Sequence, residues 1–232
     1  CKMKTHALER VTGGVKNLYG CISGLHKAKG HTQYTNADIF ARQLIDLNQL
    51  IAPRFCVMDG IVAMDGNGPT SGDPVKMNVL LLGNDPVAID SVYCHLVHLD
   101  PQMVPTNVHG ETMGLGTWRE ENIRLLSEDG EITIQEAVER FGNPDFNVDR
   151  KKQRSNLWNR FNNGFLRYFQ KKPYIVTDKC KKCGVCVEAC PVEGKALQFK
   201  NGRKQPPVYN YHKCIRCFCC QEMCPHKAIQ VK

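Results

Sequence analysis

The feature that most constrains this chain is a repeated array of cysteines near its C-terminal end. One run reads Cys180-x2-Cys183-x2-Cys186-x3-Cys190-Pro191. A second run repeats the pattern 34 positions later as Cys214-x2-Cys217-x2-Cys220-x3-Cys224-Pro225. Three thiolates spaced by two residues can bind three irons of one cubic cluster from a single loop. The array therefore predicts two [4Fe–4S] clusters.

The spacing resembles that of bacterial two-cluster ferredoxins, in which the fourth cysteine of each run binds the other cluster. The resemblance implies one cluster on Cys180, Cys183, Cys186 and Cys224, and a second on Cys214, Cys217, Cys220 and Cys190. Structural zinc is an alternative, because Cys-x2-Cys pairs also bind zinc, but zinc gains nothing from a third cysteine or from a repeated Cys-Pro ending. We expect the additional Cys219 to be a small buried residue.

Basic residues surround the predicted ligands, at Lys179, Lys181, Lys182, Lys213 and Arg216. They form either a docking face for an acidic redox partner protein or ordinary solvated side chains, and the sequence leaves both interpretations open. The formal net charge of the chain is +8, but a thiolate-bound cluster is anionic. We expect no nucleic-acid partner, because no helix-turn-helix or aromatic RNA-binding motif accompanies the charge.

The location of the protein is predicted from what the sequence lacks and from its cysteines. No apolar run approaches the roughly 20 residues that cross a bilayer, so we expect no transmembrane segment, and we see no secretory signal. Cysteines spaced for clusters indicate a reducing cytoplasm. Because the chain opens on Cys1 rather than Met, we expect residues to be missing before it.

Three segments are predicted. Residues 1–148 alternate strand-like and helix-like stretches, which indicates an α/β domain. We expect strands at 55–58, 77–82 (buried) and 123–126, and helices over 39–51 after a Thr35–Asp38 capping box, from Pro86, and from Thr133 to Gly142. Residues 149–172 form a basic amphipathic linker helix, with Trp158, Phe161, Phe165 and Phe169 at helical spacing; it packs between domains or lies on a membrane surface. Residues 173–232 form the small α+β ferredoxin-like domain.

Polar residues of the α/β domain suit a small anionic ligand. Lys2, Lys4, His6 and Lys16 would attract a carboxylate or phosphate. Asp59, Asp65 and Asn67 could add polar contacts or bind a cation, and Asn17 is expected at the same site. We expect residues 59–74 to form a glycine-rich loop that a ligand can approach, although it matches neither a phosphate-binding nor a dinucleotide motif. Asp90 is expected to hold backbone rather than act as a base, and Cys21, Cys56 and Cys94 to be buried thiols.

Four motifs of this domain resemble the family called domain of unknown function 362. They are Lys-x-Lys-Thr-His at 2–6, Lys-Asn-Leu-Tyr-Gly at 16–20, Asp-Gly-Ile-Val-Ala-Met-Asp-Gly-Asn-Gly-Pro at 59–69 and Asp-Pro-Val-Ala-Ile-Asp at 85–90. The resemblance covers about residues 1 to 130 and implies a redox role in anaerobic metabolism without naming a substrate. Family members usually carry a further N-terminal segment, so the resemblance implies an incomplete site.

Three functions follow from these features. The leading hypothesis is a redox enzyme, or an enzyme subunit, that feeds electrons through the clusters to the anionic site. The alternatives are a non-catalytic electron carrier and a maturation factor, each acting on a protein partner.

Overall fold

The computed structural model describes residues 1–23, 36–151 and 171–231. The chain forms two compact units, Cys1–Asp149 and Arg150–Lys232, and each is described by itself. Most of the predicted linker helix of residues 149–172 lies outside the described residues.

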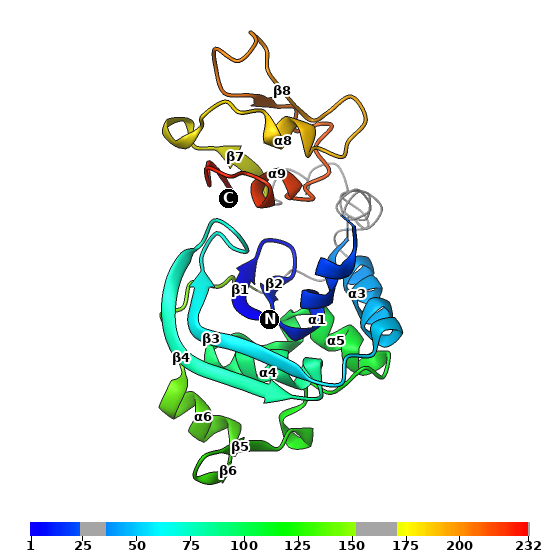
Figure 1. Ribbon diagram of the computed structural model, residues 1–232, viewed down its shortest axis with the longest axis vertical. Coiled ribbons are helices and arrows are strands. Elements are labelled where there is room, and N and C mark those ends of the chain that lie inside the picture. Colours follow the sequence, from blue (N-terminus) through cyan, green and yellow to red (C-terminus); the bar gives the residue numbers. More distant parts are fainter. Residues whose placement is uncertain (24–35, 152–170, 232) are drawn as a thin grey trace. The chain divides into compact units, whose positions relative to one another are not determined.

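The first unit is built on a mixed sheet with the strand order β2-β1-β3-β4 (Figure 1). The strands are β1 (Lys2–His6), β2 (Arg10–Thr12), β3 (Cys56–Asp65) and β4 (Asp73–Gly83). Strand β1 runs parallel to β3 and antiparallel to β2, and β3 forms a long antiparallel hairpin with β4. The predicted α/β class is therefore confirmed for this unit, with a sheet of mixed direction.

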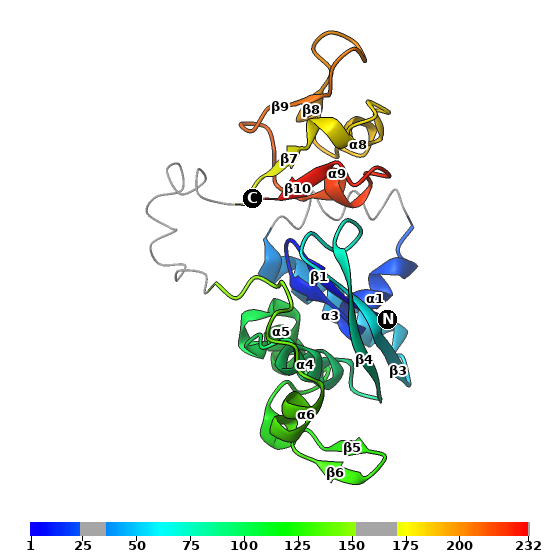
Figure 2. The ribbon, with the colours of Figure 1, turned by 90° about the vertical axis from the view of Figure 1, so that its left-hand side faces the viewer.

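Helices cover one face of this sheet (Figures 1 and 2). Helix α4 (Pro86–Leu96) packs directly on it, and its buried Tyr93 shares a core with Met3 of β1 and Met58 of β3. A second core joins α1 (Gly14–Asn17), the 3-10 helix η1 (Leu18–Cys21) and α3 (Ala37–Ile51) around Tyr19 and Phe40. Helix α5 (Pro105–Thr112) packs against α3 and α4.

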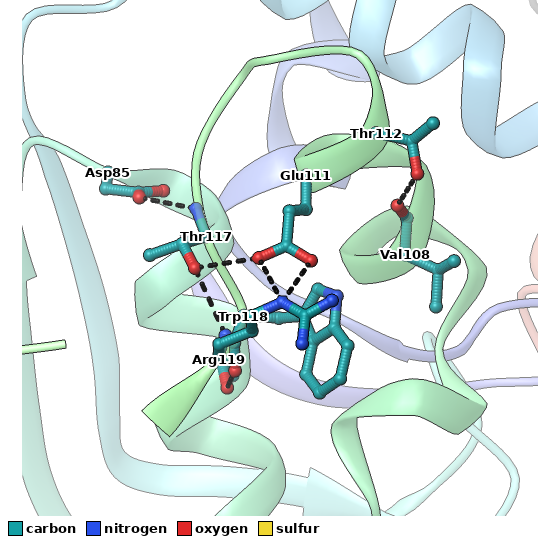
Figure 3. A network of polar contacts seen from close by, with 8 residues as sticks. Asp85, Val108, Glu111, Thr112, Thr117, Trp118 and Arg119 are labelled. Carbon is teal, nitrogen blue, oxygen red and sulfur yellow. Dashed lines mark hydrogen bonds and ion pairs between the residues drawn. The ribbon is translucent and has the colours of Figure 1, made fainter. Parts of the chain in front are cut away.

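Helix α4 begins at Pro86, as the sequence predicts, and its start is held by the side chain of Asp85. One carboxylate oxygen accepts hydrogen bonds from the backbone N–H groups of Val87 and Ala88, and the other accepts one from Thr117. Figure 3 shows that Thr117 and Arg119 in turn reach Glu111 of α5. The cap therefore also ties the segment after α5 to α4.

A small hairpin and a helix complete this unit. Strands β5 (Leu125–Ser127) and β6 (Gly130–Ile132) pair only with each other, and short 3-10 turns lie at η2 (Pro101–Met103) and η3 (Glu120–Asn122). Helix α6 (Ile134–Phe141) begins with the predicted capping box of Thr133 and Glu136, and its C-cap is Gly142. The helix before β3 is also present, but its N-cap is Asn36, not Thr35, which lies outside the described residues.

The glycine-rich segment 59–74 differs from the predicted loop. Residues 59–65 continue strand β3, and only residues 66–72 form the turn. Met58 and Gly60 face the core on one side of a register shift, and Ala63 and Asp65 on the other, while Ile61 and Val62 at the shift are both exposed. Strand β4 is likewise buried on one side only, since Leu80 and Leu82 are 49% and 56% exposed, and the prediction of a fully buried strand was wrong.

The second unit is small and rich in cysteine, with short strands. The first copy of the repeat supplies β7 (Pro173–Ile175), η5 (Thr177–Lys179), α8 (Val185–Glu188) and β8 (Leu197–Gln198). The second supplies β9 (Val208–Tyr209), α9 (Cys219–Glu222) and β10 (Ile229–Val231). Strand β7 pairs with β10 and β8 with β9, so the two copies interlock.

Candidate iron–sulfur site and the polar residues of the α/β unit

The cysteines of the second unit line two hollows. The first is lined by Cys180, Cys183, Cys186 and Cys224. The second is lined by Cys190, Cys214, Cys217 and Cys220. Their empty space, including the part open to solvent, is about 340 and 320 Å³. Each hollow thus receives three cysteines from one run and the fourth from the other run. Cys219 is buried, as predicted.

Left-handed backbone positions curl each run around its hollow. In the first run, Lys182 has φ 57° and Gly184 has φ 90°. The equivalent residues of the second run, Arg216 and Phe218, have φ 60° and 59°. These turns sit between successive cysteines and direct three sulfurs to one side. Glycine adopts this conformation freely, whereas Phe218 does so at a cost that its buried ring offsets.

Hydrogen-bond donors point at several of the sulfurs. The backbone N–H of Ala196 donates to the sulfur of Cys190, and that of Ala228 to the sulfur of Cys224, each at 3.3 Å. The hydroxyl of Tyr209 lies 3.2 Å from the sulfur of Cys220. A thiolate bound to iron can only accept, so these groups would stabilise its negative charge.

The spacing of the thiols favours cubes over single zinc ions. Within the described ranges, no three His, Cys, Asp or Glu side chains converge closely enough to hold one metal ion. A structural zinc requires four ligands at about 2.0–2.3 Å from a single atom. A four-iron cube instead takes one thiolate at each iron corner and holds them further apart. Four thiols around each hollow fit that requirement.

Two of the predicted ligand-binding residues of the α/β unit form an ion pair with each other. The ammonium of Lys2 lies 2.5 Å from the carboxylate of Asp59, across the β1–β3 pair. The hydrogen bond from Lys2, with a second from the N–H of Ile61, holds the pKa of Asp59 below its usual range. Since Met3 and Met58 point to the helix-covered core, this ion pair and Lys4 lie on the opposite face of the sheet.

The other predicted residues lie elsewhere in the unit. His6 is buried, and its Nδ1 accepts from the backbone N–H groups of Leu8 and Glu9, which leaves the ring proton on Nε2. Lys16 and Asn17 end α1 on the helical side of the sheet, and Asn67 lies in the β3–β4 turn. A single ligand site on Lys2, Lys4, His6, Lys16, Asn17, Asp59 and Asn67 stays a prediction.

Two acids are buried in this unit, and the sequence predicted the role of only one of them. Asp90 holds the backbone, as predicted, by accepting from the N–H groups of Gly14 and Val15 at 2.5 and 3.1 Å. Glu9 was missed: it is fully buried, and neither carboxyl oxygen has a hydrogen bond. Burial raises the pKa of Glu9 to about 8, with the charge of Lys16 opposing the rise. No local pattern marks Glu9, because its burial comes from tertiary packing.

The prediction of three buried thiols holds for one of them. Cys94 is buried, Cys56 is half-buried and Cys21 is exposed. Cys21 closes a 3-10 turn and Cys56 begins a strand at the end of the sheet, and neither place is enclosed on all sides.

Comparison with known proteins finds a matching family in each of the two units. The family described as "Domain of unknown function (DUF362)" matches residues 1–95, and a "4Fe-4S dicluster domain" matches residues 172–225. The chain carries a DUF362 domain followed by a 4Fe-4S dicluster domain. The dicluster domain binds two [4Fe–4S] clusters, as the cysteine array predicts, and its eight predicted cysteine ligands line the two hollows.

One curated relative extends across both domains. The "Thylakoid-associated protein sll1697" of Synechocystis sp. is 33% identical over 181 residues, which are 77% of this chain and 55% of the relative. The chain therefore spans about half the length of that relative. No solved structure matches the chain. In the described part of the chain, no helix has the length and apolar character needed to span a membrane.

Proposed function

We propose that this chain is an electron-transfer protein that relays single electrons through its two [4Fe–4S] clusters to a redox partner protein. The observation that carries the proposal is the sharing of cysteines between the hollows. In the crossed ligation, one cluster is held by Cys180, Cys183, Cys186 and Cys224, and the other by Cys214, Cys217, Cys220 and Cys190. Two clusters fixed in one interlocked unit suit electron hopping from one to the other.

The basic residues beside the clusters would select an acidic partner. Lys181 and Lys182 line the first hollow, and the Nζ of Lys182 donates to the carbonyl oxygen of Lys204. Positive charge around an electron-transfer site steers negatively charged partners and raises the association rate at low salt. Lys179, Lys213 and Arg216 would extend the same face.

A second candidate is an oxidoreductase, or a subunit of one, acting on a small anion in the DUF362 domain. It is favoured by Lys16, whose charge acts on the buried Glu9, because a cation beside a buried acid suits proton transfer to a bound anion. It is disfavoured by Lys2, which Asp59 already neutralises. A maturation factor that hands electrons to another protein would share the first mechanism.

The clusters also bear on where the protein works. We infer a reducing compartment such as the cytoplasm, and an anaerobic type of metabolism, because cluster thiolates are sensitive to oxidation. The name of the relative, a thylakoid-associated protein, suggests attachment to a membrane surface as the alternative.

Metal and sulfide analysis tests the proposal. Protein purified without oxygen should contain about eight irons and eight sulfides, since two cubes are expected. Cys180→Ser should lose about half of both, whereas Cys219→Ser, the matched control, should lose neither. Zinc without sulfide in the purified protein would overturn the proposal.

Reduction kinetics distinguish the two candidate functions. If the clusters serve an acidic partner, the double charge reversal of Lys181 and Lys182 to Glu should slow electron transfer to an anionic acceptor at low salt and leave it unchanged at high salt. If the DUF362 domain is the destination, Lys16→Ala should instead abolish retention and reduction of a small anion.

A further inference from the structure

Two thiols of the DUF362 domain, outside the cysteine array of the sequence, face each other. The sulfurs of Cys1 and Cys56 lie 3.5 Å apart. Cys56 opens β3, and the backbone N–H of Asp59 donates to the carbonyl oxygen of Cys1 at 2.9 Å. This hydrogen bond fixes Cys1 beside β3. Both cysteines are half-buried, so the pair is held by the sheet while part of it remains open to solvent.

Gly14 lies close to Cys56 and also binds a buried acid. A Cβ placed on Gly14, the first residue of α1, would be 3.0 Å from the sulfur of Cys56. The N–H of the same Gly14 binds the carboxylate of Asp90. Burial raises the pKa of Asp90 to about 7 and also raises the pKa of the Cys56 thiol above its usual value. Cys56 is therefore protonated in the resting dithiol and reacts second, after Cys1.

We propose that Cys1 and Cys56 form a redox-active dithiol that closes to a disulfide by exchange with low-molecular-weight disulfides. A disulfide has an S–S distance of about 2.05 Å, so the two sulfurs, now 3.5 Å apart, need only a small approach. The other cysteines of this unit differ: Cys21 is exposed, and Cys94 is buried with the amide of Asn107 at 3.7 Å from its sulfur.

The exchange balances in two steps. The thiolate of Cys1 attacks one sulfur of the disulfide, whose S–S bond breaks, and the leaving thiolate takes up the proton that Cys1 lost. The thiolate of Cys56, its proton passed to water, then attacks the sulfur of Cys1, and the second thiolate leaves and takes up a proton to become a thiol. The protein dithiol is thereby oxidised by two electrons, and the external disulfide is reduced to two thiols.

The test uses the full chain with its clusters, equilibrated without oxygen in mixtures of oxidised and reduced glutathione. Free thiols are then alkylated, and the digest is analysed by mass spectrometry for the Cys1–Cys56 linked peptide. We expect this peptide to rise with the fraction of oxidised glutathione, while Cys94 remains a free thiol. The visible absorbance of the clusters, recorded in the same samples, reports separately whether the iron–sulfur assignment fails.

The variant Cys56→Ser removes the resolving thiol and gives a second readout. In this variant Cys1 should accumulate as the mixed disulfide with glutathione, because nothing displaces it. Cys94→Ala, the matched control, should leave formation of the linked peptide unchanged. The proposal is wrong if Cys1 and Cys56 remain separately alkylated at every glutathione ratio, or if either pairs equally well with other cysteines.

Discussion

Glu9 is a carboxyl group that the α/β unit buries without a hydrogen bond. Its pKa rises from 4.5 to about 8 because burial disfavours the charged form. Between these two values the unfolded chain loses the proton while the folded chain keeps it. The stability contributed by the neutral acid is therefore full below about pH 4.5 and is lost as the pH rises through about 8.

The variant Glu9→Gln should reduce this pH dependence. Glutamine keeps the shape and has no charge to bury, so the variant should gain about 1–3 kcal/mol relative to the wild type at pH 8 and little at pH 5. Chemical unfolding followed by tryptophan fluorescence at both pH values measures the difference in the free energy of unfolding between the variant and the wild type. Asp90, whose pKa is also raised, should leave a residual slope. The exposed Glu128→Gln is the control, and an equal gain in that variant would contradict the account.

Tyr209 should raise the reduction potential of the cluster that Cys220 binds. Its hydroxyl lies 3.2 Å from the sulfur of Cys220, and a hydrogen bond to a thiolate favours the more negative, reduced cluster. Tyr209→Phe should lower the potential of that cluster by about 40 mV, which is roughly 1 kcal/mol for one electron.

Tyr211 offers a matched control for this measurement. Its ring stacks on that of Tyr209 with centroids 5.3 Å apart, but its hydroxyl donates to the carbonyl oxygen of Pro173. Potentiometric titration of Tyr211→Phe should show a much smaller shift. Equal shifts in both variants would mean that ring packing, and not the hydrogen bond to sulfur, sets the potential.

At the level of residues, the sequence predicted the features that depend on neighbours along the chain and missed those that depend on tertiary contacts. The two clusters could be predicted because a cube dictates the spacing of its cysteines along the chain, and the assignment of the eight individual ligands stays a prediction. The capping box of Thr133 and Glu136 could be predicted because its two residues are only three positions apart in the chain. Glu9 and Tyr209 could not, since their roles come from residues that only the fold brings near. The ion pair of Lys2 with Asp59 was missed for the same reason.

The β3–β4 hairpin is the element that the sequence misrepresents most. Glycine, aspartate and asparagine are typical of loops, and they led to a loop prediction over 59–74. In the sheet, Gly60 instead permits close packing, because a Cβ there would collide with the sulfur of Met3 in β1. Glycine within a strand often marks such a close approach.

Gly60→Ala should therefore weaken the contact between β1 and β3. We expect a loss of about 1–3 kcal/mol in the free energy of unfolding, the usual cost of overpacking a core. Gly20→Ala is the control, because a Cβ at Gly20 would meet nothing within 4 Å and its φ is not positive. Urea unfolding compares the two, and equal stability would contradict the packing of β1 on Gly60.

Helices were predicted better than strands in this chain. Helices α4 and α6 begin where Pro86 and Thr133 indicate, because a proline at the first position and a capping residue are local signals. Strand β1 was not predicted, because it begins with the polar pattern Lys-x-Lys. Its core-facing residue Met3 becomes buried when β3 and α4 pack against it. Partner strands that lie over fifty residues away leave no mark in a short window.

At the scale of the whole molecule, the two copies of the repeat build similar but unequal hollows. Lys181, Lys182 and His226 line the first. The counterparts of Lys181 and His226, Ile215 and Val192, line the second hollow, whereas Arg216, the counterpart of Lys182, is not among its lining residues. Positive charge stabilises the reduced cluster. The cluster on Cys180, Cys183, Cys186 and Cys224 should therefore have the higher potential, and the two clusters should be distinguishable in one titration.

The central claim is that each cluster takes its fourth ligand from the other run, and potentiometric titration monitored by electron paramagnetic resonance tests it most directly. Cys224→Ser should perturb the same signal as Cys183→Ser, the higher-potential one, and leave the other intact. Cys190→Ser should perturb the signal that Cys217→Ser perturbs. If Cys224→Ser instead alters the signal that responds to Cys217→Ser, each run holds its own cluster and the crossed ligation is wrong.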